Sequence, residues 1–151
     1  MAWWKSFRRK LRTARGNSFR DWMVIAGAWW MLQVFFFLLR INSLERLNRI
    51  TGKINIRIPV PSDVLGWTWH REKLIQMAAR LHIFPMSCLP RALTLRWMAS
   101  RHGIPSELRI GMGESSTRFQ AHAWIEVAGQ AIGEAEDINE RFTVFTPFST
   151  R

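Results

Sequence analysis

The sequence is poor in the residues that define several protein classes. One cysteine among 151 residues excludes a disulfide framework within the chain and any metal site built from cysteines alone. Nine glycines and six prolines are too few for a low-complexity or disordered polymer. The four histidines form no His-x-x-x-His pair, which argues against a zinc hydrolase. We therefore expect no metal and no cofactor, and the single thiol is compatible with a reducing compartment.

Acidic residues are also scarce, and their distribution divides the chain. There are 11 Asp and Glu against 22 Lys and Arg, so the net charge is +11. Residues 1–60 hold 12 Lys and Arg and 2 Asp and Glu, whereas residues 61–151 hold 10 and 9. Because the second part is nearly neutral and carries no recognisable nucleic-acid motif, we expect no nucleic-acid partner. The pattern predicts a basic N-terminal region, residues 1–60, before a core of residues 61–151.

The first twenty residues contain seven basic side chains and no acid. Trp3, Trp4, Phe7 and Leu11 recur at spacings of three and four, which predicts a basic amphipathic helix. Three roles stay open for it: a solvated arm, a contact with an acidic partner, or a contact with an anionic membrane surface.

Residues 22–39 are an apolar run with Gln33 as its one polar side chain. Eighteen residues reach the lower length limit of a transmembrane helix, and a basic stretch before an apolar run also imitates a secretory signal. No Ala-x-Ala cleavage site follows, and basic residues flank both ends of the run. We favour a helix buried in the core or against a partner in a cytoplasmic protein, with membrane association as the open alternative.

The middle of the chain predicts helices separated by proline breaks. A short helix should end at Gly52, an alternating stretch over 53–58 suits a strand or a linker, and prolines 59 and 61 interrupt the chain. Ser62 or Asp63 then caps a helix that Pro85 should stop.

Residues 87–145 predict one helix followed by antiparallel strands. Ser87 is a good N-cap for a helix that ends at Gly103. Alternation predicts strands over 107–112 and 121–127, with a polar loop over 113–117 after the first of them. Residues 128–129 suit a hairpin turn that leads into a returning strand over 130–134, and a last strand is expected over 142–145. This order is typical of the α+β class.

Cys88 lies at the predicted start of that helix. The free N–H groups and the positive end of the helix dipole favour a thiolate there, with Arg91 adding positive charge. The alternative is an inert cysteine packed against leucines 89 and 93.

His122 stands in an otherwise apolar strand and needs a polar partner, because an unsatisfied buried group costs about 1–3 kcal/mol. The hairpin brings Glu134 toward it, with Glu136 and Asp137 as the other candidate acids. Thiol, imidazole and carboxylate in this order suit nucleophilic catalysis on a carbonyl, with the Cys88 N–H available to the oxyanion.

Four segments together resemble a known enzyme family: the blocks that start at Cys88 (Cys-Leu-Pro-Arg-Ala-Leu) and Ala121 (Ala-His-Ala-Trp-Ile-Glu-Val), and between them 103–105 and 108–111. They are similar to the transglutaminase-like leader peptidases of lasso-peptide biosynthesis, the stand-alone protease half of the B protein of the microcin J25 type. The resemblance covers roughly residues 60–140.

The resemblance implies a papain/transglutaminase-like core with a helical region before it, in which Cys88 is the nucleophile and His122 the base. The acid of that family lies twelve residues after the histidine, usually as Asp, and that position is Glu134 here. It implies cleavage of a leader from a ribosomally made precursor. A separate small leader-recognition protein and an ATP-using lasso cyclase are the implied partners.

The N-terminal region gains a use from this resemblance. We expect residues 1–50 to dock a partner or the precursor, with Trp3, Trp4, Arg8, Arg9, Trp29 and Trp30 as binding residues. Two other functions stay open, a transglutaminase-like acyl transfer to an amine and a non-catalytic membrane or peptide-binding adaptor.

Overall fold

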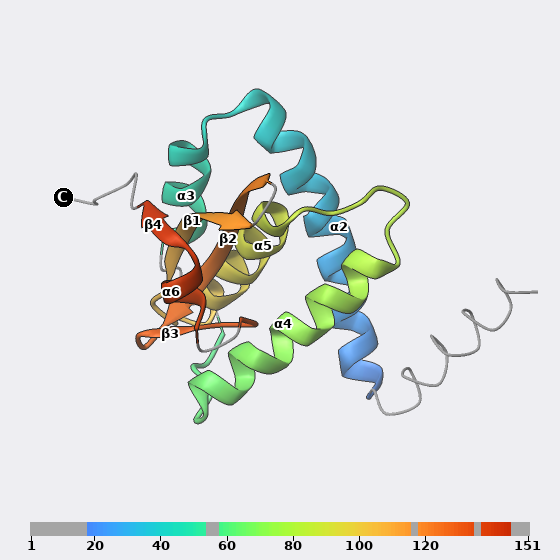
Figure 1. The fold of residues 1–151 in the computed structure, drawn as a ribbon. Coiled ribbons are helices and arrows are strands. Elements are labelled where there is room, and N and C mark those ends of the chain that lie inside the picture. Colours follow the sequence, from blue (N-terminus) through green and yellow to red (C-terminus); the bar gives the residue numbers. More distant parts are fainter. Residues whose placement is uncertain (1–17, 54–57, 116–117, 135–136, 146–151) are drawn as a thin grey trace, which may run out of the picture.

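The computed structural model describes residues 18–53, 58–115, 118–134 and 137–145. Within these ranges helices come first: α2 (Phe19–Ile41), α3 (Leu44–Gly52), α4 (Val64–Arg80) and α5 (Cys88–Arg101). They are followed by β1 (Glu107–Ser115), β2 (Arg118–Val127), β3 (Gln130–Ala131), α6 (Ile138–Arg141) and β4 (Thr143–Phe145). The strands form one antiparallel sheet in the order β3-β2-β1-β4, and the predicted α+β class is confirmed (Figure 1).

Polar residues before the helices satisfy backbone groups at the helix starts. Ser43 accepts a hydrogen bond from the Arg46 N–H (3.3 Å) before α3, and Asp63 accepts one from the Gly66 N–H (2.8 Å) before α4. The sequence offered Ser62 or Asp63 as the cap of this helix, and the structure shows that the cap is Asp63. The predicted end of α3 at Gly52 is confirmed.

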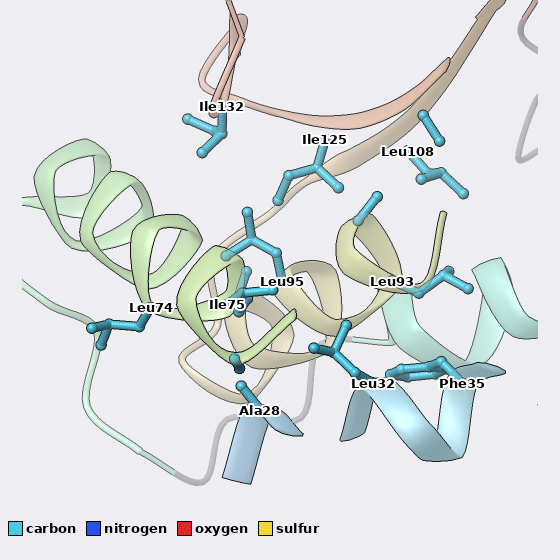
Figure 2. Packing of buried hydrophobic residues seen from close by; sticks show 14 of the residues in the cluster. Ala28, Leu32, Phe35, Leu74, Ile75, Leu93, Leu95, Leu108, Ile125 and Ile132 are labelled. Carbon is cyan, nitrogen blue, oxygen red and sulfur yellow. The ribbon is translucent and has the colours of Figure 1, made fainter. Parts of the chain in front are cut away.

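The core surrounds α5, with the sheet on one side and α2 on the other (Figure 2). Ile125 and Ile132 approach α5 from the sheet side, and Leu32 and Phe35 approach it from α2. Each such side chain contributes about 1.5–3 kcal/mol of burial free energy. Because α2 and α3 share this core with α4 and α5, the N-terminal helices hold the helix that carries Cys88 in place.

Helix α2 has two opposite apolar faces. One face is buried in the core, and it consists of Ile25, Ala28, Leu32 and Phe35. The other carries exposed side chains at spacings of three, four and seven, namely Phe19, Met23, Trp30, Val34, Phe37 and Ile41. We call this second set the exposed α2 stripe. By length and composition α2 could cross a membrane, with a mean hydropathy of 1.9 and 22% of its most apolar window buried in the protein.

The helix that Pro85 was expected to stop ends earlier than predicted. Helix α4 ends at Arg80, before Pro85, because the Leu81 N–H already closes onto the carbonyls of the last turn. The chain then turns toward α2, where His82 stacks on Trp29 with ring centroids 4.6 Å apart.

The sheet also differs from its prediction. The loop expected over 113–117 is wrong for residues 113–115, because β1 runs to Ser115, which pairs with Arg118 at the start of β2. The returning strand predicted over 130–134 is only two residues long, since Gly133 adopts φ +80 and turns the chain away. The last strand starts one residue later than predicted, because Phe142 is the C-cap of helix α6, which the sequence did not predict. The helix predicted within the first 17 residues and most of the stretch 53–58 lie outside the described residues.

Candidate active site

Cys88 is the first residue of α5, as predicted. Its N-cap, Ser87, makes no side-chain hydrogen bond to the first turn. The first-turn N–H groups are therefore not capped by that hydroxyl, and the positive end of the helix dipole acts directly on the half-buried thiol.

Strand β2 carries His122 to this helix end. Gly111 of β1 is the register partner of His122, and a Cβ on it would lie 2.7 Å from Phe142 and 2.9 Å from Trp124. The absence of a side chain at Gly111 lets both rings approach the imidazole, with centroids 5.5 Å (Phe142) and 5.9 Å (Trp124) from it. The imidazole thus packs against two aromatic rings that also contact each other, with centroids 6.3 Å apart, and this restricts its orientation.

Glu134 reaches His122 from the hairpin that follows β2. The turn uses left-handed backbone at Ala128 (φ 50) and Gly129 (φ 77), as the predicted hairpin requires. The Nε2 of His122 lies 2.8 Å from a carboxylate oxygen of Glu134. Since Glu134 occupies Nε2, Nδ1 is the ring nitrogen left for the hydrogen bond between His122 and the Cys88 thiol.

Hydrogen bonding sets the charges of this pair. The bond with Cys88, followed by the one with Glu134, raises the pKa of His122 to about 9. Burial acts to raise the pKa of Cys88, but the hydrogen bonds with His122 and with the backbone of Ala123 outweigh it and lower that pKa. Both shifts favour a thiolate beside an imidazolium, which is the reactive form of a cysteine nucleophile.

A partly buried ion pair that the sequence analysis missed lies beside the site and links α4 to α5. Glu72 is 6% exposed and accepts a hydrogen bond from Arg91 of α5 (2.9 Å). Arg91 therefore pairs with Glu72, so its charge is only partly available to Cys88. Burial raises the pKa of Glu72. Glu72 lies on the same helix face as the buried Thr68 and Ile75. A charged residue on a buried helix face needs a partner, so this position could have indicated an ion pair in the sequence.

Glu72 also packs against the turn that presents Glu134. A Cβ added to Gly133 would lie 2.7 Å from the Cγ of Glu72, and Gly133 has a positive φ of 80. Glu72, Arg91, Cys88, His122, Trp124 and Glu134 all line one narrow cleft. Glu72 therefore links the ion pair with Arg91 to the turn that carries Glu134.

Gly133→Ala should destabilise the protein more than Gly129→Ala. Both glycines have a positive φ, which costs an alanine about 1 kcal/mol, but an added Cβ at Gly129 meets nothing within 4 Å. At Gly133 it also displaces the buried Glu72, which adds about 1–3 kcal/mol. Urea unfolding followed by circular dichroism measures the difference, and equal losses in the two variants would contradict the proposed role of the Glu72 contact.

The other predicted residues that the structure describes do not line this cleft. Trp29 is half-buried against His82, whereas Trp30 is 66% exposed on the α2 stripe. Asp137 is exposed before α6, and no side-chain contact to His122 is found for it. Trp3, Trp4, Arg8, Arg9 and Glu136 lie outside the described residues. Within the described ranges no group of three or more His, Cys, Asp or Glu side chains could hold a metal ion.

Comparison with known proteins identifies the family. Residues 70–146 match the family model of the transglutaminase-like superfamily. A stretch of 64 residues is 31% identical to the microcin J25-processing protein McjB of Escherichia coli, which is 42% of this chain and 30% of McjB. No solved structure matches the chain. Since the family model spans half of the chain and includes the Cys88 helix and the His122 strand, the protein belongs to the transglutaminase-like superfamily.

Proposed function

We propose that this protein is a cysteine peptidase that removes the leader from a ribosomally made lasso-peptide precursor. The observation that carries the proposal is the hydrogen-bonded series Cys88–His122–Glu134 at the start of α5. The similarity to a microcin-processing protein supports the substrate class.

The proposed reaction has two steps. The Cys88 thiolate attacks the scissile carbonyl carbon, and the first-turn N–H groups of α5 bind the resulting oxyanion. The C–N bond then breaks as His122 gives its proton to the departing amine, which leaves a thioester. Water attacks the thioester while His122 takes a proton from it, the C–S bond breaks, and the leader leaves with a free carboxylate.

The test is incubation of the protein with a candidate precursor and its recognition protein, followed by mass spectrometry. Hydrolysis gives two fragments whose masses together equal the precursor plus one water. Acyl transfer to an amine, the second candidate, gives a cross-linked product instead. The observation that supports this second candidate is the match to the transglutaminase-like superfamily, and both reactions pass through the same thioester. An unchanged precursor would instead support a non-catalytic adaptor.

Glu134→Gln should lower kcat by roughly 10–100-fold, and Asp137→Asn should leave it unchanged. Glutamine keeps the length of the side chain but removes the charge that stabilises the imidazolium. Steady-state cleavage of the precursor measures both variants. The acid assignment fails if Asp137→Asn is the inactive variant and Glu134→Gln cleaves normally.

We further propose that residues 1–60 form a docking region that shares the core with residues 61–151. The support is the basic composition of residues 1–17, which include six Lys and Arg and precede the exposed α2 stripe in the sequence. The separate recognition protein, the leader or the lasso cyclase would dock there. We propose a cytoplasmic location for the protein. If the protein contacts a membrane, the exposed α2 stripe and the basic residues 1–17 would make that contact.

Deletion of residues 2–17 tests the arm without removing a described element. We expect KM for the precursor bound to its recognition protein to rise roughly tenfold or more at low salt. The kcat for a short peptide that spans only the cleaved bond should stay unchanged, because Cys88 and His122 are untouched. Equal KM values for the full-length and shortened proteins would contradict a docking role for the arm.

A further inference from the structure

A cavity of about 420 Å³ lies between α2, α4 and the C-terminal half of α5. Its volume is within the range of ordinary ligand pockets. Arg101, on its wall, follows Cys88 by thirteen residues on one helix, which is about 20 Å along the axis. The cavity is therefore separate from the cleft that holds Cys88 and His122.

The walls combine apolar surface with two cations. Trp67 and Trp97 line the cavity, together with Met31 and Met98. The guanidinium of Arg71 lies over the Trp67 ring (5.1 Å), and that of Arg101 lies over the Trp97 ring (5.0 Å). Two indoles on different helices thus each hold one cation at this cavity, and methionine adapts readily to varied apolar groups.

No ion pair within the described part of the chain neutralises these two cations. Among the described residues, neither Arg71 nor Arg101 makes a salt bridge to a carboxylate. Asp21 acts on Arg71 through its charge, but its carboxylate is bonded to His70 (2.8 Å). Partial burial lowers the pKa of Arg71. Two half-buried positive charges beside an apolar cavity are complementary to a ligand with an apolar body and carboxylates next to it.

We propose that this cavity binds a peptide segment in which large apolar residues are flanked by acidic residues. A peptide fits better than a single fatty acid, because the two guanidiniums come from different helices and one carboxylate would leave one of them unpaired. The first seventeen residues of this chain do not fit, since they carry six positive charges and no acid. The inference rests on the cavity alone and not on the proposed cleavage.

Gly27 supplies a way to close the cavity without disturbing the fold. It lines the cavity from within α2, and an added Cβ would meet nothing within 4 Å. Leucine is also a better helix former than glycine, by about 1 kcal/mol. Gly27→Leu should therefore fold and place a side chain in the cavity. Ala26→Leu is the matched control, because Ala26 is exposed on the same helix and does not line the cavity.

The experiment uses the full chain with ¹³C-labelled methionine methyls and the probe peptide acetyl-Glu-Leu-Phe-Glu-amide. The methyl signals of Met31 and Met98 should shift saturably on titration. Acetyl-Gln-Leu-Phe-Gln-amide should bind the unmodified protein at least tenfold more weakly than the acidic probe does. The acidic probe should also bind at least tenfold more weakly to Arg71→Gln and to Arg101→Gln than to the unmodified protein. Arg80→Gln, an exposed charge on α4, is the charge control and should bind normally.

Loss of binding in Gly27→Leu with normal binding in Ala26→Leu supports the cavity as the site. The proposal is overturned if the neutral peptide binds as tightly as the acidic one, or if Gly27→Leu still binds. It is also overturned if only dodecanoate, added as a separate ligand, shifts the two methyl signals. No outcome depends on whether the protein cleaves a precursor, so the two proposals fail separately.

Discussion

Replacement of Cys88 by serine should reduce peptide cleavage by roughly 10⁴-fold or more. Serine has nearly the same size, but its hydroxyl does not ionise at neutral pH, whereas the pKa of the Cys88 thiol is lowered by His122 and Ala123. Affinity for the precursor should be unchanged, because the sulfur is not needed to hold the peptide. Single-turnover cleavage measures the first effect and calorimetric titration with the precursor the second.

The single cysteine of the chain gives this prediction an internal control. One equivalent of iodoacetamide should abolish activity in the unmodified protein and add one carbamidomethyl group by mass. The serine variant should take up none. A serine variant that cleaves at the original rate would place the nucleophile elsewhere and remove the basis of the proposed mechanism.

The part of the site that lies on regular elements was predictable from the sequence. Ser87 and Pro90 mark the start of α5 by local chemistry, and strict alternation marks β2 around His122. The Ala128–Gly129 turn follows from the left-handed backbone that such hairpins need. These features depend only on residues that are close together in the chain, so they can be predicted from the sequence before the fold is known.

What the sequence did not reveal depends on contacts between distant elements. Glu72 lies nineteen positions before Arg91, and only the packing of α4 against α5 makes them a pair. The path of the chain after α4 likewise includes a contact between distant residues, because His82 stacks on Trp29, which lies 53 positions earlier in the sequence. Glu134 was expected at the end of a strand, yet it reaches His122 from a turn that Gly133 creates.

The apolar run of 22–39 shows a different limit. A helix that is apolar all round has no periodicity to say which side is buried. The structure places Ile25, Ala28 and Leu32 in the core and leaves Trp30 on the opposite face. That division follows from where α4 and α5 pack against α2, and it produces both the exposed α2 stripe and the wall of the cavity.

Replacement of His122 by asparagine should abolish cleavage and slow the alkylation of Cys88 at neutral pH. The hydrogen bond with His122 is the largest influence that lowers the pKa of Cys88, so its loss should move the inflection of the alkylation rate to higher pH. In the unmodified protein, cleavage should fall again as the pH rises through about 9, where the imidazolium loses its proton. Iodoacetamide kinetics and precursor cleavage from pH 5 to pH 11 give the two profiles.

The raised pKa of His122 also makes the stability of the protein depend on pH. Because folding raises the pKa of His122 from 6.5 to about 9, its contribution is complete below pH 6.5 and is lost as the pH rises through about 9. The free energy of unfolding of the unmodified protein should therefore fall over this window relative to that of His122→Asn.

His70→Gln is the matched control for the alkylation and cleavage profiles. His70 pairs with Asp21 away from the cleft, so this variant should alter neither the alkylation profile nor the pH above which cleavage falls. A Cys88 alkylation profile that is identical with and without the His122 imidazole would mean that the two side chains titrate independently, and the thiolate–imidazolium mechanism would have to be abandoned.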